Sequence, residues 1–317
     1  MKIFLPDHLS DILRDRVQRI APAYEVAWLD AAGNSSSDPR DGEVIFLHWG
    51  VDRAVLEQLV LGAPNLRWLH TISAGVEHVL FPELIASDVV VTNARGIFAP
   101  QIAETVVAYV LAVAKHLPRF FAQQQEHRWE VIPLQELGGR TVGIVGMGGI
   151  GAAVARRCRA FDMRVIGLRK HPRPTAWADA VLPASRLHDL LAQSDFVVVT
   201  TPLTRETQGM IGRSELAAMK PDGWLINVAR GGVVDEAALI AALRGGEIGG
   251  ACLDVFAEEP LPMYSPLWDM PNVIITPHNS WSSPQLERRA VDLFLENLQR
   301  YVGGESLLNI VNKQAGY

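Results

Sequence analysis

Cysteine is scarce in this 317-residue chain, which contains only Cys158 and Cys252 and no CxxC pair. Both cysteines lie among small and apolar residues, so we expect two buried, reduced thiols and no disulfide framework. The histidines show no paired ligand spacing, and we therefore expect no metal site.

Basic charge and long apolar runs are also scarce. Lys and Arg number 29 against 35 Asp and Glu, and the net charge of -6 gives no basic field for nucleic acid phosphates. The longest continuous apolar stretch, 106–114, is half of what a membrane span needs. The first residues meet a proline and an acid where a signal peptide needs an apolar core. We expect a cytoplasmic protein that binds neither nucleic acid nor membrane.

Short β-type runs alternate with helical stretches along the whole chain, whose length fits two domains with a cleft between them. This alternation predicts parallel sheets with helices on both faces, and hence an α/β protein of two doubly wound domains. The runs are KIFL, YEVAWL, EVIFLHW, LRWLHTI and VVVTN in residues 1–93, then RTVGIVG, RVIGLR, FVVVTT, WLINVA, GACLDV and NVIITP. Helical stretches at 8–20 and 52–61 separate the first runs.

Two longer helical stretches mark the domain organisation. Residues 99–117 are apolar on nearly every face, which is typical of a helix buried between structural units. A second helix is predicted over 284–302, and the tail SLLNIV is expected to return to the first domain. We therefore predict a discontinuous domain of 1–97 plus 285–317 and a second domain of 98–284.

The segment GMGGIG at 146–151 follows an apolar strand and begins a helix. Gly146 permits a tight turn, Gly148 lets the backbone approach a pyrophosphate, and Gly151 lets the helix pack close to the strand. A glycine turn used only for packing is the alternative, but the strand-turn-helix context favours dinucleotide binding through the helix N-terminus. The predicted cofactor contacts here are Gly146, Met147, Gly148, Gly149, Ile150 and Gly151.

The next strand ends at Arg169 and Lys170, where sites that prefer NAD usually carry an acid. With His171 and Arg173 following, this loop suits the 2′-phosphate of NADP(H), and no carboxylate is present there to repel it. An ordinary solvated basic loop is the alternative. We expect NADP(H) to be preferred and NAD(H) to be possible.

Three residues that carry chemistry follow predicted strands: Arg230 in NVARGGVVDE, Glu259 in DVFAEEP and His278 in TPHNSW. Ligands bind at the carboxyl ends of strands in doubly wound sheets. Singly, such an arginine is more often a surface residue and such a histidine more often structural, so the argument depends on the set.

The set resembles the D-isomer-specific 2-hydroxyacid dehydrogenase family over almost the whole chain. The matching segments are SAGVEH at 73–78, GMGGIG at 146–151, TTPLTRET at 200–207, NVARGGVVDE at 227–236, DVFAEEPLP at 254–262 and SPLWDMPNVIITPH at 265–278. The resemblance implies a Rossmann cofactor domain and a flavodoxin-like substrate domain. It also implies an enzyme that reduces a small 2-keto acid such as glyoxylate or hydroxypyruvate to the D-2-hydroxy acid, and a homodimer paired through the cofactor domain.

The resemblance further implies a role for each site residue. His278 is the general acid, Glu259 stabilises its protonated ring, and Arg230 binds the substrate. Asp254 holds the nicotinamide carboxamide, and the other expected cofactor contacts are Thr201, Pro202 and Ala229. The backbone amides of Ala74, Gly75 and Val76 receive the substrate carboxylate.

Departures from the family pattern leave the substrate open. Thr200 stands where many relatives carry histidine, and Asn279, Ser280 and Trp281 replace the commoner small run after the catalytic histidine. The candidates for lining the substrate pocket are Trp49, Trp281, Phe98 and Tyr264, each with a core or dimer contact as the alternative.

Two other functions remain open at the level of sequence. Formate and phosphite dehydrogenases share the fold and glycine motif, but formate oxidation needs no proton exchange with a hydroxyl, so Glu259 favours keto acid chemistry. A non-catalytic NAD(P)H-sensing corepressor of the C-terminal-binding-protein type keeps the same three residues. The basic loop at Arg169 does not suit NADH sensing.

Overall fold

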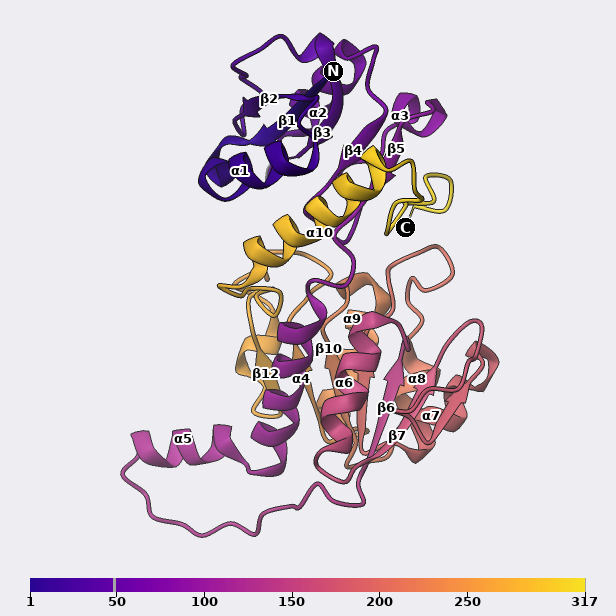
Figure 1. Cartoon of the computed structure of the whole chain (residues 1–317). Helices are drawn as coiled ribbons and strands as arrows, with labels where there is room; N and C mark the ends of the chain where they lie inside the picture. The colour runs from indigo at the N-terminus through magenta and orange to yellow at the C-terminus, as the bar shows by residue number, and fades with distance from the viewer. Residues whose placement is uncertain (48–49, 317) are drawn as a thin grey trace. The chain divides into compact units, whose positions relative to one another are not determined.

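The computed structural model describes residues 1–47 and 50–316, so Trp49 lies outside the described residues. The chain divides into two compact units. The first comprises residues 1–98 and 283–317, and the second comprises residues 99–282 (Figure 1). Each unit is built on a parallel sheet of its own.

The first unit contains a five-stranded sheet in the order β2-β1-β3-β4-β5, with every pair parallel. This is the strand order of flavodoxin-like folds. The strands are β1 Lys2–Pro6, β2 Glu25–Leu29, β3 Gly42–Phe46, β4 Trp68–His70 and β5 Val90–Thr92. The helices are η1 Asp7–Leu9, α1 Ser10–Ile20, η2 Pro39–Asp41, α2 Arg53–Gly62, α3 Pro82–Ala86 and α10 Leu286–Val302.

The C-terminal segment contributes to this first unit. Helix α10 packs against α1, and Arg16 on α1 pairs with Asp292 on α10 at 2.7 Å. The tail then runs antiparallel to β5, where Ile310 bridges Thr92 and Val311 N donates to Val91 O at 2.8 Å.

The second unit contains a seven-stranded parallel sheet in the order β12-β11-β10-β9-β6-β7-β8. Its first six strands along the chain follow the Rossmann order, and β12 adds a seventh at one edge. The strands are β6 Thr141–Val145, β7 Arg164–Leu168, β8 Ala180–Leu182, β9 Phe196–Val199, β10 Trp224–Asn227, β11 Gly250–Leu253 and β12 Val273–Ile275. The runs noted in the sequence form all of these strands except β8. The fold class of two doubly wound domains is confirmed.

Helices cover both faces of this second sheet (Figure 1). The helices of this second unit are α4 Ala99–Ala114, α5 Leu117–Gln125, α6 Gly149–Arg159, η3 Ala184–Arg186, α7 Leu187–Gln193, α8 Arg213–Ala217, η4 Gly231–Val233, α9 Glu236–Gly245 and η5 Pro266–Asp269. Helix α4 packs along α6. Within the described residues no single helix meets the length and hydropathy needed to cross a membrane; α4 and α5 meet them only as a pair bent by 64°.

The helix predicted over 99–117 is too long by three residues. The chain turns at His116, whose φ of 50° is left-handed, and α5 begins at the next residue. Pro118 has no N–H to donate to the carbonyl of Ala114, with which its ring would clash in a continuous helix, whereas proline suits the first turn of a new helix. Thus Pro118 separates α4 from α5.

Candidate active site

The glycine turn lies where the strand order reverses, between β6 and its neighbours β7 and β9. Gly146 has a φ of 108°, and a Cβ atom on it would lie 2.7 Å from Thr201 N in the loop after β9. A Cβ on Gly151 would lie 2.4 Å from Gly146 O. Both positions therefore require glycine, and the motif contacts the segment containing Thr201 and Pro202 directly.

The other side of the turn is open. A Cβ on Gly148 or Gly149 would meet no atom within 4 Å, and no side chain caps the N-terminus of α6 at Gly148. The first N–H groups of a helix have no partner inside it and attract anions. Met147 is buried, with Cε 2.5 Å from the Cβ position of Gly167, so its backbone alone is available. The turn fits the pyrophosphate of a dinucleotide.

The basic loop follows β7, with Arg169 and Lys170 both exposed. Lys170 Nζ lies 2.7 Å and 3.0 Å from the two carboxylate oxygens of Glu206, which follows β9. The expectation that no carboxylate lies beside this loop is therefore wrong. Because Glu206 is 36 residues away in sequence, only the pairing of strands in the sheet reveals it.

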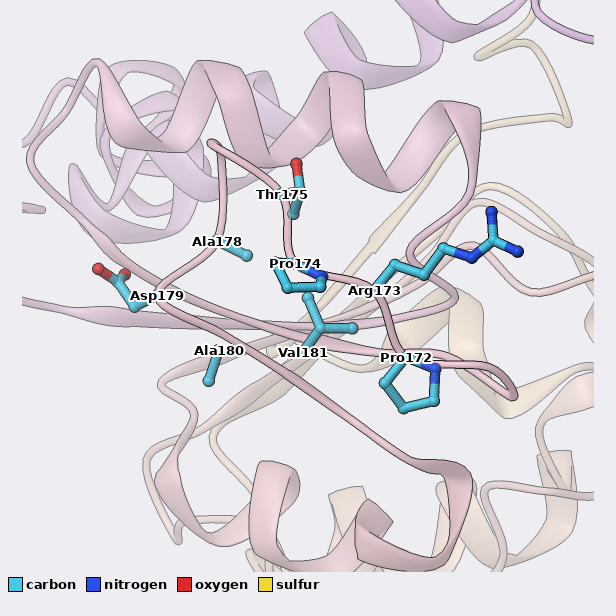
Figure 2. A pocket seen from close by; sticks show the side chains of 8 residues that line it. All are labelled: Pro172, Arg173, Pro174, Thr175, Ala178, Asp179, Ala180 and Val181. Atoms are coloured by element: carbon cyan, nitrogen blue, oxygen red, sulfur yellow. The ribbon is translucent and has the colours of Figure 1, made fainter.

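The same connection lines a cavity of about 240 Å³ (Figure 2). Its walls come from the chain between β7 and β8 and from the start of β8, namely Pro172, Arg173, Pro174, Thr175, Ala178, Asp179, Ala180 and Val181. Asp179 is held by Arg159 at 2.8 Å, and the backbone N–H of Val165 and the paired arginine lower the pKa of its carboxyl group. This connection is therefore anchored to both α6 and β7.

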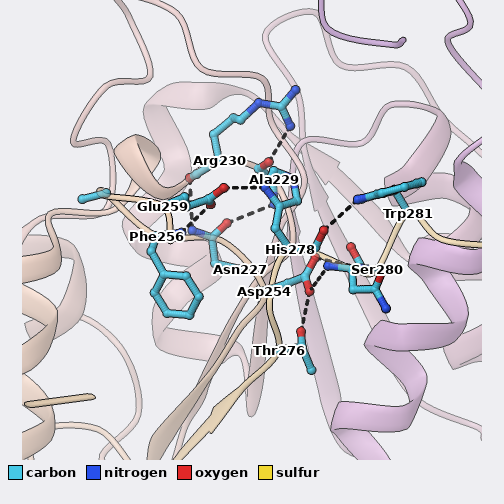
Figure 3. Close-up of polar contacts among 12 residues, drawn as sticks. Asn227, Ala229, Arg230, Asp254, Phe256, Glu259, Thr276, His278, Ser280 and Trp281 are labelled. Atoms are coloured by element: carbon cyan, nitrogen blue, oxygen red, sulfur yellow. Dashed lines mark hydrogen bonds and ion pairs between the residues drawn. The ribbon is translucent and has the colours of Figure 1, made fainter. Parts of the chain in front are cut away.

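Arg230, Glu259 and His278 follow β10, β11 and β12 (Figure 3). These three strands are neighbours and parallel, so their carboxyl ends lie at one edge of the sheet. The glycine turn after β6 lies at the same edge because the whole sheet is parallel.

The His278 imidazole is paired with a carboxylate. Nδ1 of His278 lies 2.6 Å from Glu259 Oε2, and Glu259 Oε1 accepts a hydrogen bond from Phe256 N at 2.9 Å. Both side chains are about one third exposed, His278 at 39% and Glu259 at 34%. A carboxylate at Nδ1 fixes the ring orientation and directs Nε2 to the opposite side.

Arg230 is placed by two further contacts of its loop. A Cβ on Gly231 would lie 1.9 Å from the carbonyl of Phe256, so the loops after β10 and β11 touch through their backbones. Asn227 accepts from Ala229 N and donates to Arg230 O, both at 3.1 Å. Sequence reasoning missed Asn227; its signal was a polar residue at the end of an apolar strand.

Asp254 is completely buried and organises the segment that carries His278. Its Oδ1 accepts from Thr276 Oγ1 and from Asn279 N, its Oδ2 accepts from Ser280 N at 3.1 Å, and its carbonyl accepts from His278 N at 2.8 Å. A buried carboxylate needs such partners. A carboxylate oxygen can accept two hydrogen bonds, so Oδ2 retains one acceptor position.

His278 itself has a φ of 49°. The left-handed region costs a residue other than glycine about 1 kcal/mol or more, and such conformations persist where the surroundings hold them. Here Trp281 Nε1 donates to His278 O at 2.7 Å, and Gln101 Nε2 on α4 donates to Trp281 O at 2.9 Å.

The loop expected to receive a carboxylate belongs to the first unit. Asn93 Nδ2 donates to Ala74 O, and Ser73 Oγ donates to Gly75 O, each at 2.7 Å. Val76 is buried and Ala74 is exposed. Both carbonyls are therefore fixed by neighbouring side chains.

No group of three or more His, Cys, Asp and Glu side chains suitable for a metal ion occurs in the part of the chain that the structure describes. A Rossmann sheet, an open glycine turn and a histidine-carboxylate pair at the same edge define a nicotinamide-dependent oxidoreductase.

Comparison with known proteins agrees with this class. Residues 107–280 match the family described as D-isomer specific 2-hydroxyacid dehydrogenase, NAD binding domain. The chain is 39% identical to a glyoxylate/hydroxypyruvate reductase B of Pectobacterium carotovorum over 321 residues, which cover 98% of each chain. It is therefore a member of the D-isomer-specific 2-hydroxyacid dehydrogenase family and an NAD(P)-dependent enzyme.

Two crystal structures are similar over almost the whole length. One is a D-isomer specific 2-hydroxyacid dehydrogenase from Xanthobacter autotrophicus Py2 in complex with NADPH and MES; it has a TM-score of 0.85 at 34% identity and covers 100% of this chain and 99% of that chain. The other is an NADPH-dependent glyoxylate/hydroxypyruvate reductase from Sinorhizobium meliloti in complex with NADP and sulfate. It has a TM-score of 0.84 at 30% identity, with the same coverage.

Proposed function

We propose that this protein is an NADPH-preferring reductase that converts a small 2-keto acid, such as glyoxylate, hydroxypyruvate or a larger one, to the D-2-hydroxy acid. The observation that carries the proposal is the 2.6 Å contact between His278 and Glu259 at the edge that bears the glycine turn. Such a pair donates a proton to a carbonyl oxygen as charge develops there.

Each catalytic side chain then has a defined task. The bound nicotinamide supplies the hydride for the keto carbon. His278 donates a proton from Nε2 to the keto oxygen, while Glu259 holds Nδ1 and stabilises the protonated ring. The Arg230 guanidinium binds the substrate carboxylate and stabilises negative charge on the oxygen.

The remaining predicted contacts complete the proposed site. The turn from Gly146 to Gly151, including Ile150, holds the pyrophosphate, with Thr201, Pro202 and Ala229 on the adjacent loops. Asp254 uses its remaining acceptor position for the nicotinamide carboxamide. The amides of 74–76 bind the substrate carboxylate, and the exposed part of the Trp281 ring lines the pocket.

The preference for NADPH rests on charge at the end of β7. Arg169 and Lys170 stand where a carboxylate would bind the ribose hydroxyls of NADH, and a guanidinium pairs well with a 2′-phosphate. The two similar structures are named with NADPH or NADP. Because Glu206 already neutralises Lys170, Arg169 carries the larger share of the proposed selectivity.

We also propose a homodimer paired through the cofactor-binding unit. Helix α5 and the segment after it reach away from the sheet of their own unit (Figure 1). They expose Phe121 at 62%, Trp129 at 98% and Val131 at 85%. Large apolar side chains exposed along one segment are typical of association surfaces. Sedimentation should give the mass of a dimer for the wild type and the mass of a monomer for Trp129→Glu. The same mass for both proteins would contradict the proposal.

The proposed activity is tested by following NADPH and NADH oxidation against glyoxylate, hydroxypyruvate, pyruvate and phenylpyruvate. We expect turnover of at least one keto acid, faster with NADPH, and the preferred member reports the size of the pocket. Turnover of formate or phosphite instead would replace the keto acid assignment. Cofactor binding without any turnover would favour a sensing protein.

A further inference from the structure

Helix α4 holds the segment that carries His278 at two points. The hydroxyl of Tyr109 lies 2.5 Å from Thr276 Oγ1, and Gln101 Nε2 donates to the carbonyl of Trp281 at 2.9 Å. Gln101 and Tyr109 are both buried, and their spacing of eight residues places them on one stripe of the helix. The two anchored residues, Thr276 and Trp281, lie on either side of His278.

Between these two anchored residues, the backbone N–H and the backbone carbonyl of His278 both form hydrogen bonds. Its N–H donates to Asp254 O at 2.8 Å, and its carbonyl accepts from the Trp281 indole at 2.7 Å (Figure 3). The left-handed φ of 49° is unfavourable for histidine without external support. The hydrogen bond from the Trp281 indole therefore stabilises the backbone conformation of His278, which orients the imidazole.

We infer that Trp281 and Gln101 are positioning residues for His278, acting in series from α4 through the indole to the histidine backbone. The inference rests on the proposed reductase function, since it explains how the acid of that reaction is aimed. Trp281 is 39% exposed, so its side chain can line the pocket while its N–H holds the loop. A displacement of about 1 Å in a catalytic group costs on the order of 100-fold in rate.

Trp281→Phe separates the two roles, because phenylalanine keeps an aromatic ring and loses the N–H. We expect kcat to fall about 10-fold, with the KM values for keto acid and NADPH within about twofold of the wild type. The proton NMR signal of the His278 Nδ1–H bonded to Glu259 should shift or broaden. Gln101→Met, which keeps the length and loses the donor, should lower kcat by a smaller factor of about 3.

The double variant and a matched control sharpen the test. Because Gln101 acts through Trp281, the effects of the two substitutions should not multiply in the double variant. Trp268→Phe removes another bond from an indole to a carbonyl, between Trp268 Nε1 and Pro262 O at 3.0 Å, and it should leave kcat unchanged.

Three results would overturn the inference. One is a raised KM for the keto acid with unchanged kcat in Trp281→Phe, since Trp281 would then contact substrate only. Another is an equal loss in Trp268→Phe, which indicates general loosening of the loops. The third is an unchanged Nδ1 proton signal in Trp281→Phe. That signal is measured without turnover. A wild-type protein without activity would therefore refute the proposed function, and the NMR comparison would still test the positioning role.

Discussion

Both sheets place a histidine at the carboxyl end of a strand, and the two differ in nearly every other respect. His70, the last residue of β4, is fully buried, and its Nδ1 lies 2.7 Å from Thr92 Oγ1. The centroid of its ring lies 5.0 Å from the centroid of the Phe46 ring. His278, after β12, is 39% exposed and is paired with the Glu259 carboxylate.

The two histidines differ in the hydrogen-bonding partner of the ring and in exposure to solvent. Burial lowers the pKa of His70 to about 3, so this ring stays neutral, and no described residue hydrogen-bonds its Nε2. A neutral buried ring contributes packing. A ring with a carboxylate at Nδ1 and an exposed opposite side can transfer a proton, so environment and not residue type assigns the chemistry.

The largest expected effect comes from removal of the His278 imidazole. His278→Ala should lower kcat about 10³-fold, because a positioned general acid contributes roughly 10²- to 10⁴-fold. NADPH binding, measured by fluorescence titration, should be retained because the glycine turn follows a different strand. An unimpaired rate in this variant would remove His278 as the acid.

His70→Ala should act on stability instead. Loss of a buried ring that contacts Phe46 should lower the free energy of unfolding by about 3 kcal/mol in urea titrations. The kcat per folded molecule should stay within about twofold of the wild type. A large loss of kcat with unchanged stability would erase the contrast between the two histidines.

The pH dependence of stability should also change in His70→Ala. The unfolded chain binds a proton at His70 below its ordinary pKa of 6.5, whereas the folded chain does so only near 3. The stability contributed by the neutral ring is therefore complete above about pH 6.5 and is lost as the pH falls toward 3. The wild type should show a slope steeper by about 1.4 kcal/mol per pH unit in that window. Equal slopes would contradict burial of a neutral histidine.

The smallest expected effect extends the comparison to two exposed arginines of the second unit. One lies at the carboxyl ends of the strands and the other at the amino ends. Arg169 follows β7, whereas Arg244 lies in the last turn of α9, before β11 begins. Arg169→Asp should raise the KM for NADPH about 10-fold and leave that for NADH nearly unchanged, since it removes a charge-assisted bond to the 2′-phosphate. Arg244→Asp makes the same change in net charge and should alter neither value. Equal effects on both cofactors in Arg169→Asp would refute the phosphate assignment.

Much of the fold could be predicted because its signals are local. Alternating apolar runs indicated both parallel sheets, and glycine spacing indicated the turn after β6. Strand β8 was missed because Ala180–Leu182 contains a single β-branched residue, whereas the equally short β12, Val273–Ile275, consists of three. The long helix ended early, at Ala114, because Pro118 cannot donate the backbone hydrogen bond that would continue it.

The candidate site was predictable only in part. Arg230, Glu259 and His278 follow strands that the sequence reveals, and parallel pairing then places them at one edge. The supporting groups carried no comparable signal. Asn227 is one polar residue in an apolar strand, and Gln101 lies in a helix whose composition indicates only burial.

The sequence by itself determined every strand except β8, the helices α1, α2, α4, α6 and α10, the glycine turn and the identity of the three residues proposed for catalysis. These depend on periodicity, turn preference and residue chemistry, all of which act over a few residues. The tertiary structure alone decided which distant groups meet. Lys170 and Glu206 are 36 residues apart, and Gln101 and Trp281 are 180 apart. Such contacts depend on strand order and helix packing, which bring separate segments together without leaving a pattern in either one.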